Sequence, residues 1–137
     1  MLVRLAVLPV GSVAGTIVHH MGVTVLVVDD HRGFRASVRE LLESDGFEVI
    51  GEAGDAASGI EAVRSLRPDI VLLDIQLPDF DGILASKRIA GLNGRSAVVL
   101  TSSCDVSDIA GALAESPARG FIPKSELSGD ALRELVV

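Results

Sequence analysis

Two adjacent aspartates, Asp29 and Asp30, directly follow an apolar run in this sequence. Two carboxylates about 4 Å apart repel each other by roughly 4 kcal/mol at an effective dielectric near 20, so an unpaired acidic pair is costly. A bound cation would remove that cost. Asp is also a preferred residue at the start of a helix. The pair by itself therefore leaves a metal site and a helix cap about equally open.

Three further polar residues each end an apolar run. Asp74 follows "DIVLL", Thr101 follows "SAVVL" and Lys124 follows "GFIP". Taken singly, an Asp begins a turn, a Thr caps a helix and a Lys is a solvated surface charge. Together with the acidic pair they provide three carboxylates, a hydroxyl and an ammonium. This combination is much less expected by chance than any one of its members.

These groups suit metal-assisted phosphoryl transfer. Mg²⁺ prefers a few carboxylates together with waters and phosphate oxygens over a complete protein cage. Such an ion can bridge a carboxylate and an incoming phosphoryl group, while a hydroxyl and an ammonium bind the other oxygens. Asp74 would then be the nucleophile, since carboxylates can form acyl phosphates.

Short apolar runs alternate with amphipathic stretches from Val23 onward. The runs are rich in β-branched residues, which is typical of strands buried on both faces of a sheet. Expected strands cover residues 23–29, 47–53, 69–74, 96–102 and 120–124. Expected helices run from Phe34 to a glycine cap at Gly46, from a cap at Asp55 to Pro68, over about 83–92 and 106–115, and around Leu132 to Val136.

This alternation predicts an α/β fold, in which a doubly wound parallel sheet with right-handed crossovers carries helices on both faces. In open sheets of this kind, ligands lie outside the carboxyl ends of the strands. The acidic pair, Asp74, Thr101 and Lys124 all stand at such ends, so we expect them to face one crevice.

Composition narrows the class of protein further. The 137 residues are 48% hydrophobic, which suits one compact domain. The formal net charge is −7, which argues against a general affinity for nucleic acid or for anionic lipid. The single cysteine, Cys104, cannot form an internal disulfide, so a reducing compartment is the simpler assumption.

The first 22 residues differ in composition from the rest. Their apolar run faintly resembles a secretory signal, but Pro9, Gly11 and Gly15 interrupt it. It is also too short and broken to span a bilayer. We expect residues 1–22 to be an N-terminal extension that is either disordered or upstream of a true start at Met21.

Four separated motifs resemble the receiver domain of two-component response regulators. They are "VVDDH", "DIVLLDIQLPDFDG", "VVLTSS" and "GFIPKSEL", in that order. The similarity covers nearly all of residues 23–137, and Pro78 and Gly82 match the loop and helix start that follow the family's phosphorylation site. The resemblance implies a receiver domain at 23–137 with a flavodoxin-like (βα)5 sheet in strand order 2-1-3-4-5.

The resemblance also implies the roles of the strand-end residues. A sensor histidine kinase would transfer phosphate to Asp74, and Thr101 and Lys124 would contact the phosphoryl group. Phe121 stands where the family often has an aromatic that swings inward when Thr101 moves toward the phosphate. The Mg²⁺ ligands so implied are Asp29, Asp30, Asp74 and the backbone carbonyl of Gln76.

The "DDH" start and the "GFIPKSELSGDALRELV" ending look like receivers that precede a helix-turn-helix of the LuxR/FixJ type. That likeness implies a cytoplasmic regulator of transcription, which would contact DNA only through an output domain that residues 23–137 do not contain. A homodimer on phosphorylation is a further expectation. No membrane contact and no turnover of an external metabolite are expected.

Three alternatives remain to be weighed. A haloacid-dehalogenase-like Mg²⁺-dependent phosphatase would use an aspartyl nucleophile too, but it typically needs an Asp where Gln76 stands. A flavodoxin would cradle phosphate in the loop after its first strand, and here the charge of "DDH" would repel it. A degenerate receiver acting only as a binding scaffold would lack key side chains, all of which are present.

Overall fold

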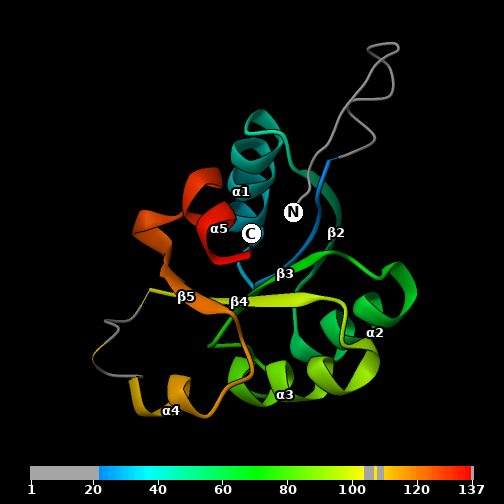
Figure 1. Cartoon of the computed structure of the whole chain (residues 1–137), viewed down its shortest axis with the longest axis vertical. Helices are drawn as coiled ribbons and strands as arrows, with labels where there is room; N and C mark the ends of the chain where they lie inside the picture. The colour runs from blue at the N-terminus through cyan, green and yellow to red at the C-terminus, as the bar shows by residue number, and fades with distance from the viewer. Residues whose placement is uncertain (1–21, 104–106, 108–109, 137) are drawn as a thin grey trace.

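The computed structural model describes residues 22–103, 107 and 110–136. Its centre is a five-stranded sheet in the order β2-β1-β3-β4-β5, in which every pair of neighbouring strands is parallel. Helices cover both faces of the sheet (Figure 1). This arrangement confirms the predicted doubly wound sheet and its strand order.

Each expected strand is present, within a residue or two of its expected bounds. The strands are β1 (Thr24–Val28), β2 (Glu48–Ala53), β3 (Ile70–Asp74), β4 (Ala97–Ser102) and β5 (Gly120–Pro123). The helices are α1 (Arg32–Ser44), α2 (Ala56–Leu66), α3 (Gly82–Asn93), α4 (Ala110–Ala114) and α5 (Gly129–Val136), with a short 3₁₀ turn at Lys124–Glu126.

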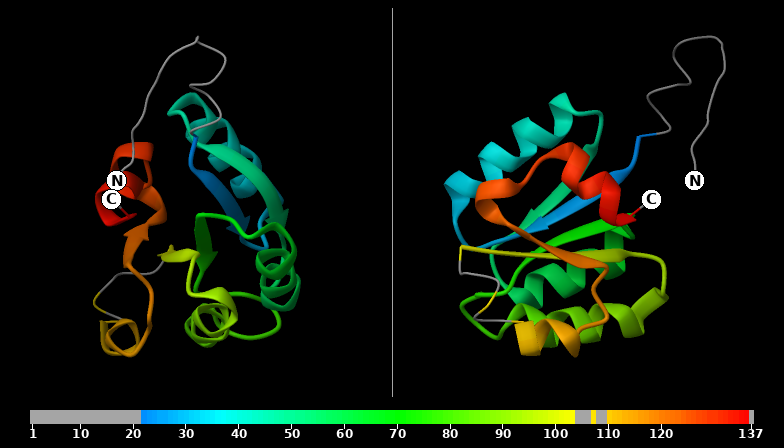
Figure 2. Two further views of the ribbon diagram at one scale, coloured as in Figure 1. Left: turned by 45° about the vertical axis from the view of Figure 1, so that its right-hand side comes forward. Right: turned by 60° about the vertical axis from the view of Figure 1, so that its left-hand side comes forward.

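The sheet separates two apolar cores. Successive residues of a strand point to opposite faces. In β1, Val25 and Val27 accordingly belong to the core under α1 and α5, whereas Leu26 and Val28 belong to the core under α2 and α3. Figure 2 shows these two helix pairs on opposite faces of the sheet. Burial on both faces explains why the strands are apolar throughout.

Side-chain caps set the starts of two helices. Asp55 accepts a hydrogen bond from Ser58 N at 2.7 Å, as predicted, and Asp81 accepts one from Leu84 N at 2.8 Å. The residue before α1 is His31, whose side chain makes no capping bond. Neither member of the acidic pair is therefore the N-cap of α1, which removes the helix-cap interpretation of that pair.

The structure shifts the expected end of the fifth strand. Lys124 begins the 3₁₀ turn rather than ending β5, because the ladder with β4 ends where Ser102 meets Pro123, which has no N–H to donate. The expected helix over 106–115 is described only as Ala110–Ala114. Predictions made for residues 1–21 and Cys104 lie outside the described part of the chain.

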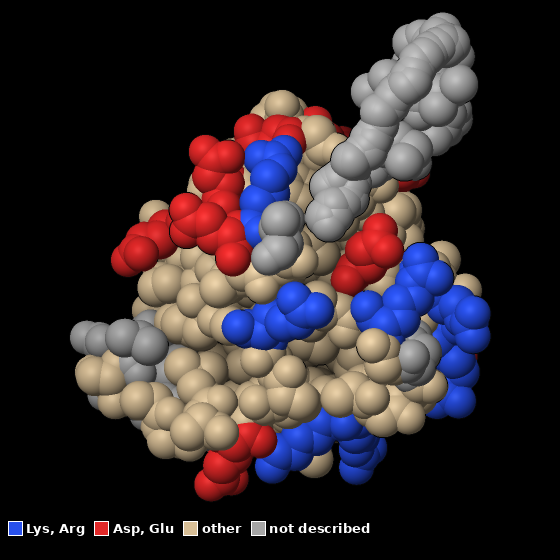
Figure 3. Space-filling model, in the orientation of Figure 1, with Lys and Arg blue, Asp and Glu red and all other residues tan. Residues whose placement is uncertain are grey.

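The described helices include none that is both long and apolar enough to cross a bilayer. The excess of acidic residues is unevenly spread on the face shown in Figure 3. Acidic side chains gather there over the α1 and α5 side, whereas most basic side chains lie over the side of α2 and α3. The negative charge of this face is thus concentrated on one side of the sheet.

Candidate functional site

Four adjacent strands bring the predicted residues to one edge of the sheet. Asp29 directly follows β1, Asp74 ends β3, and Thr101 lies next to last in β4. Asp74 and Thr101 are paired neighbours in the ladder between β3 and β4. Lys124 directly follows β5. The expectation that these groups converge is correct for the two carboxylates and the ammonium, because Lys124 contacts both Asp29 and Asp74.

A single ammonium lies between two buried carboxylates. Lys124 Nζ is 2.7 Å from Asp29 Oδ2 and 3.3 Å from Asp74 Oδ2. Asp29 and Asp74 are only 1% and 2% exposed. Apart from this ion pair, Asp29 Oδ2 has no hydrogen-bond partner among the described residues. A buried carboxylate oxygen with only one neighbouring cation is suited to receive a metal ion.

The charges of Asp29, Asp74 and Lys124 influence one another's pKa values. Burial raises the pKa of the Asp74 carboxyl above its usual value, and the nearby charge of Asp29 raises it further. Burial also acts to raise the pKa of Asp29, but the hydrogen bond to Lys124 and the backbone N–H of His31 outweigh it and lower that pKa. Burial alone would lower the pKa of Lys124, whereas both carboxylates raise it. Lys124 therefore stays charged and favours ionised carboxylates.

Backbone N–H groups orient both buried carboxylates. His31 N donates to Asp29 Oδ1 at 2.8 Å, and Gln76 N donates to Asp74 Oδ1 at 3.1 Å. In each case the donor lies two residues after the aspartate, as in a turn built around an Asx side chain. One oxygen of each carboxylate is thus fixed by its own loop, and the other faces Lys124.

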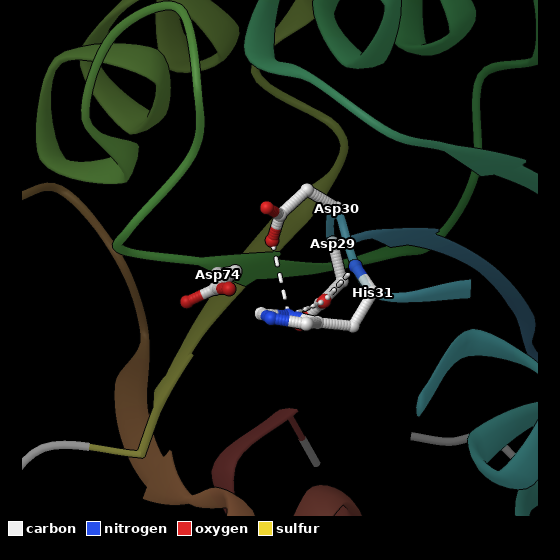
Figure 4. A group of neighbouring side chains, drawn as sticks. All are labelled: Asp29, Asp30, His31 and Asp74. Carbon is white, nitrogen blue, oxygen red and sulfur yellow. Dashed lines mark hydrogen bonds and ion pairs between the residues drawn. The ribbon is translucent and has the colours of Figure 1, made fainter. Parts of the chain in front are cut away.

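The acidic pair completes a possible metal site. Asp29, Asp30, His31 and Asp74 each offer one ligand atom, and these atoms all lie within 4.8 Å of one another. Figure 4 shows the four side chains converging from the loop after β1 and the end of β3. The side chain of Asp30 is 37% exposed. Two buried carboxylates beside one that is open to water match the ligand set that Mg²⁺ prefers, a few carboxylates together with waters, so the residues present fit such an ion.

The positions of the other predicted residues do not test the roles expected of them. Thr101 is buried beside Asp74. Phe121 is partly buried and packs against the core under α2 and α3. Gln76 is exposed, and its carbonyl remains a predicted metal ligand. The switching roles of Thr101 and Phe121 likewise stay predictions.

Two contacts that support the loop after Asp74 were not foreseen. The Asp79 carboxylate accepts hydrogen bonds from Ala56 N and Ala57 N, each at 2.9 Å, and so ties the loop to the start of α2. Burial acts to raise the pKa of Asp79, but these backbone donors lower it on balance. Gly82 packs so tightly that a Cβ there would lie 2.3 Å from the backbone oxygen of Asp74. The only sequence signal was the glycine itself, at a helix start.

His31 is the remaining residue that sequence reasoning missed. Its Nδ1 lies 3.1 Å from Asp29 Oδ1 and 3.1 Å from Asp30 Oδ1. Dashed lines in Figure 4 mark these contacts. The adjacency of the histidine to the acidic pair was the only available signal, and a residue in the short loop between β1 and α1 can point in several directions.

Comparisons with known proteins identify a family. Residues 25–136 match the family model described as response regulator receiver domain. The chain is 37% identical over 102 residues to the positive transcription regulator BvgA of Bordetella pertussis, covering 74% of this chain and 49% of that protein. It thus spans about half the length of this curated relative and of a transcriptional regulator from Pseudomonas aeruginosa.

Solved structures agree with the sequence match. A LuxR-family two-component response regulator from Aurantimonas sp. SI85-9A1 is 31% identical, with a TM-score of 0.74 over 82% of this chain and 81% of that one. A chain of the CheX-CheY-BeF3-Mg²⁺ complex from Borrelia burgdorferi is 26% identical, with a TM-score of 0.71 over 83% of this chain and 86% of that one.

Proposed function

Because this chain belongs to the response regulator receiver domain family, we propose that Asp74 is the residue that receives the phosphoryl group from a sensor histidine kinase. The observation that carries the proposal is the pairing of buried Asp74 and Asp29 through one shared ammonium, that of Lys124. Taking these charged groups out of water is costly, and the carboxyl ends of the strands are where ligands bind in open parallel sheets.

In the proposed reaction, Asp74 Oδ2 attacks the phosphorus while the Gln76 N–H holds Oδ1. The bond from phosphorus to the donor nitrogen of the kinase breaks as the bond to Asp74 forms. Lys124 Nζ, already 3.3 Å from Oδ2, then binds a phosphoryl oxygen. Mg²⁺ held by Asp29 and Asp30, with Asp74 and the Gln76 carbonyl, would supply neutralisation of the transferred charge.

Thr101 and Phe121 would transmit the phosphorylation of Asp74 to the surface of the domain. Thr101 is the ladder neighbour of Asp74, so its hydroxyl needs only a short movement to reach a phosphoryl oxygen. We propose that Phe121 follows this movement into the space that Thr101 leaves, and that the change reaches the surface near β5.

The proposal extends to the setting of the chain. A receiver fed by a histidine kinase works in the cytoplasm, where the kinase draws on ATP. The likeness to BvgA and to a LuxR-family regulator supports control of transcription, with DNA contacted through an output domain and with dimerisation on phosphorylation. The chain itself would catalyse only its own phosphorylation and dephosphorylation.

Incubation with Mg²⁺ and acetyl phosphate, followed by intact mass measurement, tests the assignment. We expect one phosphate adduct on the wild type, none with EDTA, and none on Asp74→Asn. Asp130→Asn serves as the control, because the Asp130 side chain is 93% exposed on α5 and should leave the adduct intact. An adduct that persists in Asp74→Asn would overturn the proposal, and sustained hydrolysis of a sugar phosphate would favour a phosphatase instead.

A further inference from the structure

The imidazole of His31 makes polar contacts only with the acidic pair among the residues that the structure describes. It does not cap α1, although Asp55 and Asp81 cap the two helices that follow. Its side chain is 68% exposed, so no packing requirement holds it in place. The position of the ring therefore calls for an explanation in terms of the acidic cluster.

We propose that His31 Nδ1 is a metal ligand beside Asp29 and Asp30, and that it gives the site a preference for transition-metal ions over Mg²⁺. The inference rests on the proposed function in one respect, namely that a divalent ion binds at this cluster. It assigns a specificity-determining ligand to that ion and concerns a residue that the expected Mg²⁺ set does not contain.

The separations fit an octahedral ion. Metal–ligand bonds of about 2.1 Å at right angles place neighbouring ligand atoms about 3.0 Å apart and opposite ones about 4.2 Å apart. Nδ1 is 3.1 Å from an oxygen of each aspartate. All four candidate ligand atoms lie within 4.8 Å of one another, a limit that exceeds the separation of opposite ligands by about 0.6 Å. An ion could therefore bind this nitrogen and the carboxylates with little movement of the loop.

The nitrogen would change which ion binds best. Carboxylate and water oxygens suit Mg²⁺, whereas imidazole favours later transition metals, and affinity rises from Mn²⁺ to Ni²⁺. Without metal, Nδ1 can approach two carboxylate oxygens only as a donor. Coordination then requires the tautomer with its proton on Nε2, and the exposure of the ring leaves that nitrogen free to exchange protons with water.

The test uses a protein in which His31 is the sole histidine. Replacing His19 and His20 by asparagine gives this background, since the chain has three histidines. Adding His31→Asn gives the matched variant, and asparagine is a good N-cap, so α1 should form. Titration calorimetry gives Ni²⁺ and Mg²⁺ affinities for both proteins. Pulsed electron paramagnetic resonance of bound Mn²⁺ detects a coordinated ¹⁴N nucleus directly.

We expect ¹⁴N coupling in the single-histidine protein and its loss on His31→Asn. The ratio of Ni²⁺ to Mg²⁺ affinity should fall by at least about tenfold, because losing even a residue that only supports a ligand costs about 10- to 100-fold in metal affinity. Mn²⁺ bound without ¹⁴N coupling, or an unchanged ratio, would overturn the inference and leave the phosphoacceptor proposal standing. Absence of any divalent-ion binding would overturn both.

Discussion

Replacing Lys124 by methionine keeps most of the side-chain stem but removes the ammonium, which lies between two buried carboxylates and 4.4 Å from the centroid of the Phe34 ring. At an effective dielectric of about 20, the 2.7 Å and 3.3 Å contacts correspond to attractions of about 6 and about 5 kcal/mol. The ligand oxygens of the two carboxylates lie at most 4.8 Å apart, so they repel by at least about 3.5 kcal/mol. The attraction of the ammonium to the two carboxylates therefore exceeds the repulsion between them. When the ammonium is removed, only the repulsion remains.

Desolvation of all three groups offsets much of this attraction. Breaking a buried ion pair by removing one partner typically costs about 3–5 kcal/mol, and we expect a loss of this size for Lys124→Met in EDTA. The loss is a large share of the ~5–15 kcal/mol that stabilises a domain. Mg²⁺ should restore more stability to the variant than to the wild type, because no ammonium then competes for Asp29 and Asp74.

Urea unfolding followed by circular dichroism, in EDTA and in saturating Mg²⁺, measures both effects. Lys87→Met is the control, because Lys87 is the only other lysine of the chain and is exposed on α3. It should change the free energy of unfolding little in either buffer. A loss below about 1 kcal/mol for Lys124→Met in EDTA, or a smaller Mg²⁺ effect than in the wild type, would refute the reasoning.

Two further changes test the surroundings of the site. Gly82→Ala should cost about 1–3 kcal/mol in urea unfolding and slow phosphorylation, because its Cβ would collide with the backbone of Asp74. Gly91→Ala in the same helix, with nothing within 4 Å, should instead stabilise by about 0.5–1 kcal/mol, and equal effects at both positions would contradict the steric argument. The hydrogen bond from Arg39 lowers the pKa of Glu52 in the folded state. This carboxylate therefore stabilises the fold at pH values above its unfolded pKa, near 4.5, and that stabilisation is lost as the pH falls through the lower folded pKa. Glu52→Gln should therefore lose less stability than the wild type on acidification from pH 7, and parallel curves of unfolding free energy against pH would count against this role.

The sequence alone determined which residues lie at the edge of the sheet where the candidate site forms. Apolar runs and helix caps are local features, so the strands, their order of occurrence and the polar residues at their ends could be predicted with errors of a residue or two at most boundaries. Asp29, Asp74 and Lys124 converge as expected because parallel strands deliver their carboxyl ends to one edge. Of the expected fourth helix, the structure describes Ala110–Ala114, and residues 106, 108 and 109 lie outside its described part.

Only the tertiary structure decided how those groups share their charges. The register between β1 and β3 and the path of the turn after β5 place Lys124 closer to Asp29 than to Asp74. The link from Asp79 to the start of α2 spans more than 20 residues, and the orientation of His31 depends on the loop that follows Asp29. Local pattern carries no information on these contacts, because each depends on distances between segments that only packing brings together.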